Sequence, residues 1–142
     1  MKYILRKTYK FEAAHRLPLV ADDHKCKGMH GHSYKLTFEI SSSTLIKGMV
    51  CDFANMSLVV KSVITNVLDH KILNEITGLE NPTAENIALW CANLFCHEFR
   101  MNYYRVNHPY YKDRKEQALK LEAVEVQETD TSFCRLELQR HL

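Results

Sequence analysis

Apolar and polar residues alternate near both ends of the chain, and this pattern predicts β-strands. In the first segment, aromatic and aliphatic side chains fall on every second position, as in a strand with one buried face. The same period predicts strands over residues 3–15, 32–42, 119–128 and 133–138. A loop over residues 16–31 joins the first two strands, and residues 129–131 form the turn between the last two.

Helical spacing of apolar residues predicts two helices between the strand pairs. Asp52 or Asn55 can cap the first helix, and Asn81 followed by Pro82 suits the start of the second. The apolar positions of the first helix are Met56, Val60, Val63 and Val67. Those of the second are Ile87, Trp90, Cys91, Leu94 and Phe95. Residues 101–117 predict a short extension of this helix and then a loop.

The order strand, strand, helix, helix, strand, strand predicts an α+β fold. A four-stranded, mostly antiparallel sheet with both helices on one face fits this order. Such a sheet leaves two strand edges exposed, and several copies can remove them by pairing edge to edge into a barrel. We therefore expect a homo-oligomer. A monomer with polar outer faces is the alternative.

Length and composition narrow the class of protein. At 142 residues the chain, 1–142, is one domain by size. Its net charge of +2 is too small to favour nucleic acid, and it has no apolar run of about 18 residues that would span a membrane. The five cysteines are an odd number at irregular spacing, and the N-terminus lacks a secretory signal pattern. We expect a cytoplasmic protein with reduced thiols.

Three histidines carry the main chemical signal. His30 and His32 stand two positions apart, so an extended strand places both imidazoles on one face. His15 ends the first predicted strand and can approach from a neighbouring strand. Three imidazoles suit Zn²⁺, and a tetrahedral ion with three protein ligands keeps one position open, as in catalytic sites. The expected cofactor is therefore Zn²⁺.

Cys26 lies four residues before His30, and its thiol has two interpretations. It can act beside the metal as a reactive group. It can instead be a fourth ligand, because three histidines and one cysteine would close a tetrahedral structural site. The spacing alone leaves both interpretations open.

Three further residues are candidates for catalysis. Asp69 and His70 follow the first helix, and they are either a plain helix terminus or a carboxylate that orients a proton-relaying imidazole. Glu128 ends a strand and shares a face with Val124 and Val126. Its carboxylate either reaches solvent or binds a ligand that offers paired N–H donors.

Six segments that contain these residues match a known family. They are Phe11–Pro18, His24–His32, Asp52–Phe53, Leu68–His70, Leu79–Asn86 and Val124–Thr129. They span nearly the whole chain, and on them it resembles the 6-pyruvoyl-tetrahydropterin synthase / 6-carboxy-5,6,7,8-tetrahydropterin synthase family. The chain departs from the shorter bacterial members between about Arg100 and Lys120, where it carries extra aromatic and charged residues.

The resemblance implies a tunnelling fold. Subunits of such proteins assemble into a barrel, commonly a trimer stacked as a hexamer, with sites between subunits. The zinc ligands of the family map to His15, His30 and His32. Its catalytic cysteine maps to Cys26, which argues against that thiol as a fourth ligand.

The resemblance also implies roles for the remaining candidates. The catalytic Asp-His pair maps to Asp69 and His70, and the pterin-anchoring glutamate maps to Glu128. Glu128 thereby belongs to both the catalytic and the substrate-binding residues, and Thr83 is a weaker candidate for the ring pocket.

The implied activity is that of a zinc-dependent lyase acting on a pterin triphosphate. It converts 7,8-dihydroneopterin triphosphate to 6-carboxy-5,6,7,8-tetrahydropterin, with loss of triphosphate and acetaldehyde, in queuosine biosynthesis. The alternative is the sister reaction, which stops at 6-pyruvoyl-tetrahydropterin. A third interpretation is a non-catalytic zinc-binding scaffold that presents Tyr103, Tyr104, Tyr110 and Tyr111 to a partner protein.

Overall fold

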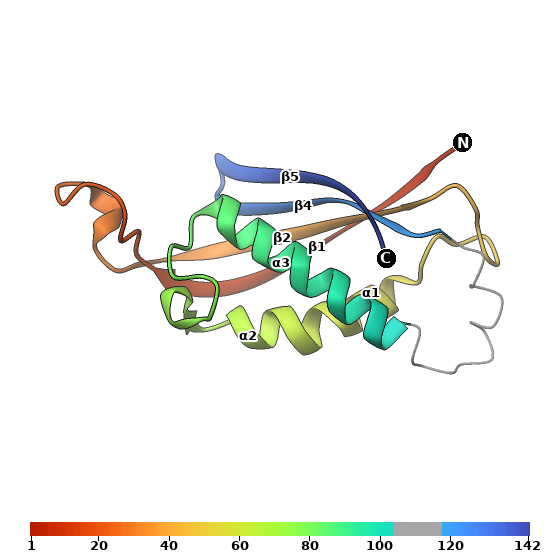
Figure 1. Cartoon of the computed structure of the whole chain (residues 1–142), viewed down its shortest axis with the longest axis horizontal. Coiled ribbons are helices and arrows are strands. Elements are labelled where there is room, and N and C mark those ends of the chain that lie inside the picture. The colour runs from red at the N-terminus through yellow and green to blue at the C-terminus, as the bar shows by residue number, and fades with distance from the viewer. Residues whose placement is uncertain (104–117) are drawn as a thin grey trace.

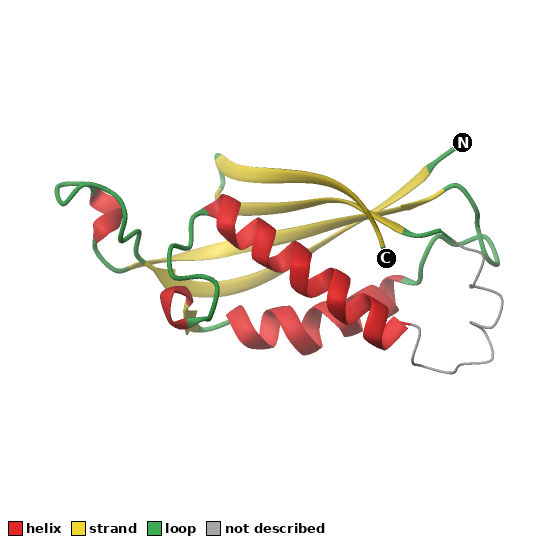
Figure 2. Ribbon diagram, viewed as in Figure 1, coloured by secondary structure: helices red, strands yellow, loops and turns green. Residues whose placement is uncertain are grey.

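The computed structural model of the chain describes residues 1–103 and 118–142. The loop predicted to run up to Gln117, with Tyr104, Tyr110 and Tyr111, lies outside the described residues. Within the described part, the elements form a sheet covered by helices (Figures 1 and 2). No helix among these residues has the length and apolar character needed to cross a membrane.

The sheet has five strands in the order β3-β1-β2-β4-β5. The four long strands are β1 (Tyr3–His15), β2 (His30–Ser42), β4 (Lys120–Thr129) and β5 (Ser132–His141). They confirm the predicted strands, and successive partners among them are antiparallel. The prediction of only four strands is wrong, because β3 (Lys71–Ile72) pairs in parallel with β1. Two residues are too few for an alternating pattern to reveal.

The first helical segment is continuous from residue 53 to 68 but changes its winding. It consists of α1 (Phe53–Val59), the π-helical η2 (Val60–Thr65) and α2 (Asn66–Leu68). As predicted, Asp52 caps α1, and its carboxylate accepts a hydrogen bond of 2.7 Å from the Ala54 amide.

The buried positions of this segment differ from the prediction at its end. Met56, Val60, Ile64 and Leu68 are buried at a spacing of four, and Val59 is buried beside them. Val67 is exposed, contrary to the prediction. The wider π-helical turn keeps the spacing at four where an α-helix would alternate between three and four.

The second long helix, α3 (Ala84–Glu98), begins two residues later than predicted. Its cap is Thr83 rather than Asn81, and the Thr83 hydroxyl accepts a hydrogen bond from the Asn86 amide at 3.3 Å. The helix then continues as the π-helical η4 (Phe99–Tyr103), which confirms the predicted short extension. The predicted Asn81-Pro82 start is therefore wrong, because Pro82 belongs to the extended segment before the cap.

The two faces of the sheet differ in chemistry. The helices cover one face, called the inner face here (Figure 2). On this face, Phe38 of β2 stacks on Phe95 of α3 with ring centroids 4.4 Å apart. The outer face carries polar pairs. Among them, Arg135 donates two hydrogen bonds to the Glu39 carboxylate, at 2.7 and 2.6 Å. This arrangement is the α+β sheet with one covered face that the alternation predicts.

Candidate metal centre

The register of β1 and β2 brings the three predicted histidines together. His15, the last residue of β1, lies directly opposite His30, the first residue of β2. His32 follows two positions later, so its imidazole is on the same face as that of His30. A slip of one residue would send the two β2 imidazoles to the other face. The predicted approach of His15 from a neighbouring strand is thus confirmed.

The ring nitrogens of these histidines are arranged as metal ligands. The Nδ1 atoms of His15 and His30 donate to the carbonyl oxygens of Pro82 and Gly28, at 2.8 and 2.9 Å. Both Nε2 atoms of the neutral rings therefore carry lone pairs, and they lie only 3.1 Å apart. Two such lone pairs repel unless a proton or a cation lies between them. Two nitrogen ligands of one tetrahedral zinc lie about 3.3 Å apart, which is close to this separation.

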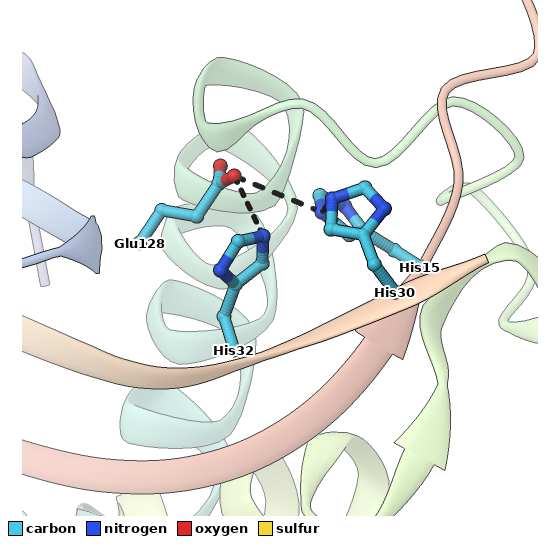
Figure 3. Close-up of side chains that lie close together, drawn as sticks. All are labelled: His15, His30, His32 and Glu128. Carbon is cyan, nitrogen blue, oxygen red and sulfur yellow. Dashed lines mark hydrogen bonds and ion pairs between the residues drawn. The ribbon is translucent and has the colours of Figure 1, made fainter. Parts of the chain in front are cut away.

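Glu128 joins the three histidines from the end of β4 (Figure 3). Its Oε1 lies 2.9 Å from the Nε2 atom of His32 and 3.8 Å from that of His15. The ligand atoms of the four residues all lie within 4.8 Å of one another. This donor set of three nitrogens and one oxygen fits a divalent cation such as zinc.

One buried nitrogen in this group supports the fit independently. The Nε2 atom of His32 is buried and has no hydrogen-bond partner among the described residues. Glu128 Oε1 is close enough, but it lies off the direction in which an N–H of the ring would point. A buried polar atom without a partner is costly, and a bound cation would satisfy it.

Burial keeps the imidazoles of His15 and His32 in the form that binds metals. It lowers the pKa of His15 and of His32, although the charge of nearby Glu128 acts in the opposite direction. A lowered pKa favours the neutral ring at neutral pH, and neutral imidazole is the ligand form. The carbonyls of Pro82 and Gly28 that orient the rings have no side-chain signature, so sequence reasoning missed them.

Tyr34 forms the wall behind the cluster. Its ring stacks on Phe11 with centroids 4.9 Å apart and meets the His15 and His32 rings edge-on. Burial, together with the charge of Glu128, raises the pKa of Tyr34, so the phenol stays protonated. Tyr34 is not among the site residues predicted from the sequence. The signal was present, because Tyr34 continues the period of His30 and His32.

Cys26 lies outside this group, in the short 3₁₀ turn η1 (Lys25–Lys27). Its amide donates to the Nδ1 atom of His24 at 3.0 Å, and its carbonyl accepts from the Leu17 amide at 2.8 Å. The thiol is free and half-buried. The interpretation of Cys26 as a fourth ligand has no geometric support here, since Glu128 occupies that place in the group.

Lys27 fastens the loop that carries Cys26. Its ammonium donates to the carbonyl oxygens of Pro18 and Val20, both at 3.0 Å, and it lies 2.9 Å from the Asp22 carboxylate. The loop is thus closed on itself by one side chain next to the thiol residue. Sequence reasoning did not identify this contact, because a lysine in a polar loop is ordinarily solvated.

The Asp69–His70 pair forms, but it is not part of the group of possible ligands. Asp69 Oδ1 accepts from the Glu12 amide at 2.8 Å and lies 3.1 Å from His70 Nδ1. The first of these contacts is the main reason why the pKa of Asp69 is lowered. His70 has a φ of 57°, and this left-handed turn out of α2 lets neighbouring residues bond where a helix would not.

His70 faces a groove of about 430 Å³ that Glu12 and Ser33 also line. Strand alternation places Glu12 and Ser33 on the outer face, opposite the imidazole of His32. His32 lines this groove as well, so one of the candidate ligands and the Asp-His pair border the same groove. Thr83, the weaker candidate, has its hydroxyl engaged as the cap of α3.

Comparisons with known proteins identify the family of the chain. The family model described as 6-pyruvoyl tetrahydropterin synthase matches residues 4–139. The chain is 32% identical to the 6-carboxy-5,6,7,8-tetrahydropterin synthase of Haemophilus influenzae over 92% of this chain and 95% of that protein. It is 40% identical to the Synechocystis protein of the same name over 62% of this chain and 70% of that one.

A solved structure gives the same fold. The 6-pyruvoyl tetrahydropterin synthase of Caenorhabditis elegans superposes with a TM-score of 0.74 at 20% identity, over 98% of this chain and 97% of that one. The sequence match over nearly the whole chain and the shared fold lead to the same conclusion. The chain belongs to the 6-pyruvoyl tetrahydropterin synthase family.

Proposed function

We propose that the protein is a zinc-dependent 6-carboxy-5,6,7,8-tetrahydropterin synthase. Its substrate would be 7,8-dihydroneopterin triphosphate, and triphosphate and acetaldehyde would leave, as in queuosine biosynthesis. Two relatives that cover much of the chain carry this name. The observation that carries the proposal is the convergence of the Nε2 atoms of His15, His30 and His32 beside the Glu128 carboxylate.

The three imidazoles would hold the ion. When bound, zinc supplies a Lewis acid that lowers the cost of negative charge beside the hydroxyl-bearing carbons of the substrate side chain. The carbonyls of Pro82 and Gly28 keep the His15 and His30 rings in the ligand orientation. The aromatic wall of Tyr34 and Phe11 limits access of water from the core side.

Cys26 would move a proton between carbons of the side chain. The bonds of its amide and carbonyl fix the turn from which the thiol projects. Asp69 orients His70 through the 3.1 Å contact, and His70 would relay protons and support the thiolate.

The separation of these groups favours a site shared between copies of the chain. The group of possible metal ligands includes neither the Asp-His pair nor Cys26. Along residues 3–12, β1 has β2 as its only strand partner among the described elements, so this edge can pair with another chain. A barrel of three or six subunits would bring His70 of one copy toward Cys26 of the next.

Glu128 would anchor the pterin ring. A carboxylate offers two acceptor oxygens to the paired N–H groups of a pyrimidine edge. Thr83 and the segment before it would line the same pocket. The anchored ring then directs its side chain toward the histidines.

Product analysis tests the proposal. Zinc-loaded protein is incubated with 7,8-dihydroneopterin triphosphate, and the products are identified by mass spectrometry. 6-Carboxy-5,6,7,8-tetrahydropterin with acetaldehyde supports it. Accumulation of 6-pyruvoyl-tetrahydropterin without acetaldehyde supports the sister reaction, and an unchanged substrate supports the non-catalytic scaffold.

A further inference from the structure

We infer that Glu128 has a second role: its carboxylate is the fourth ligand of the metal while no substrate is bound. When substrate arrives, the side-chain hydroxyls take its place, and the released carboxylate accepts the N–H groups of the pterin ring. The first half of this inference concerns the protein alone. The second half rests on the proposed function.

The distances within the group place Glu128 among the ligands and not behind them. Oε1 is 2.9 Å from His32 Nε2, which is closer than the 3.1 Å between the His15 and His30 nitrogens. It also approaches His15 Nε2, at 3.8 Å. The oxygen is thus near the nitrogens on both strands, at separations typical of neighbouring ligands of one ion.

A simple hydrogen bond between Glu128 and His32 is the alternative explanation of this contact. It would require the ring N–H to point at the carboxylate, and the geometry does not allow it, since the Nε2 atom of His32 has no hydrogen-bond partner among the described residues. Ligands of one ion have such side-on contacts, because both donor atoms point at the ion and not at each other.

The backbone at Glu128 allows its side chain to turn. The pairing of β4 with β5 shifts register between Gln127 and Thr129, and Glu128 has no partner in either neighbouring strand. Irregularities of this kind re-aim side chains and are frequent beside active sites. The histidines lie in regular paired strands, so Glu128 is the one member of the group whose backbone the ladder does not hold.

This exchange would link metal access to substrate recognition. A carboxylate on the ion offsets part of its charge and closes the site to water and to other small ligands. A substrate must then supply both the hydroxyls that replace the carboxylate and the ring that receives it. A molecule with only one of these parts would bind weakly.

Metal affinity without substrate tests the ligand role. Glu128→Gln keeps the shape of the side chain but replaces the anionic oxygen by a neutral amide. We expect the zinc dissociation constant, measured by chelator competition, to rise at least about 10-fold. The visible absorption of the Co²⁺-loaded protein should also change. Asp130→Asn, on the same hairpin and 98% exposed at its side chain, is the matched control and should leave both unchanged.

The substrate half is tested with 7,8-dihydroneopterin and the Co²⁺-loaded wild-type protein. Its hydroxyls should shift the Co²⁺ spectrum, and a pterin without the hydroxylated side chain should not. A Glu128→Gln variant with zinc affinity within about twofold of wild type and an unchanged Co²⁺ spectrum would overturn the ligand role. Neither metal measurement requires turnover, so a failed product assay would reject the proposed function and leave the ligand role of Glu128 standing.

Discussion

The three histidines on the inner face and the residues expected to move protons lie in different kinds of secondary structure. His15, His30 and His32 lie on paired strands, where the register fixes their relative positions. Cys26 lies in a loop, and His70 lies where a helix ends. The candidate metal site therefore lies within one chain, whereas Cys26 and His70 are not members of its ligand group. Mutation of Cys26 or His70 should therefore lower turnover without loss of bound metal.

The largest expected effect is the loss of a metal ligand. His32→Ala removes one of three imidazoles, so bound zinc should be lost and turnover of the pterin triphosphate should fall by ~10³-fold. Metal content by mass spectrometry and product formation measure both. His97→Ala, an exposed histidine on α3, is the control. Full zinc content in the His32 variant would contradict the ligand assignment.

Cys26→Ala should distinguish the role of the histidine group from that of the residues expected to move protons. The thiol is outside the ligand group, so zinc content should be unchanged while turnover falls by ~10²-fold or more. Cys134, another half-buried free thiol, gives the control variant Cys134→Ala. If zinc is lost together with the Cys26 thiol, Cys26 is a ligand and the separation of the two regions is wrong.

A smaller effect is expected from the loop fastening. Lys27→Met removes the donor to two carbonyl oxygens. The folded conformation of the loop should be destabilised by about 1–2 kcal/mol, and turnover should fall by about 10-fold. The rate of Cys26 alkylation should rise as the loop opens, with zinc content unchanged. Lys27→Arg keeps a donor and should restore much of both properties. Equal alkylation rates in all three proteins would show that Lys27 does not hold the turn.

The smallest effect on function is expected on the outer face. Glu39 is buried against Arg135, whose hydrogen bonds hold the pKa of Glu39 below its usual value. Because the pKa is lowered by folding, the stabilisation is present above the ordinary pKa of 4.5 and is lost as the pH falls through the folded-state value. Glu39→Gln should cost about 1–3 kcal/mol of unfolding free energy at pH 7 and less in acid.

Urea unfolding at several pH values measures this loss. Glu137, whose side chain is 79% exposed and 3.4 Å from Arg135, supplies the control Glu137→Gln. A cost for Glu39→Gln that is the same at pH 3 and pH 7 would contradict the ion-pair account.

The parts of the molecule that sequence predicted are those where side-chain chemistry repeats with a period. The alternation located the long strands, placed His30 and His32 on one face, and put Glu128 on the face of Val126. The short strand β3 and the Thr83 cap were missed, because two residues have no period and a proline can precede a cap as well as follow it.

The interactions that complete the site are less visible in sequence. Backbone carbonyls of Pro82 and Gly28 orient the rings, and any residue type could supply a carbonyl. The closeness of Glu128 to the histidines depends on the register of β4 against its neighbours and on the irregularity at that residue. Such long-range relations are set by tertiary packing and not by local pattern.

Zinc titration of metal-free protein, with turnover of 7,8-dihydroneopterin triphosphate followed at each step, tests the central claim most directly. We predict that activity rises with added zinc, saturates at one ion per chain, and is absent when His32 is replaced by alanine. Full activity in the metal-free protein, or no activity in the zinc-saturated protein, would contradict the claim.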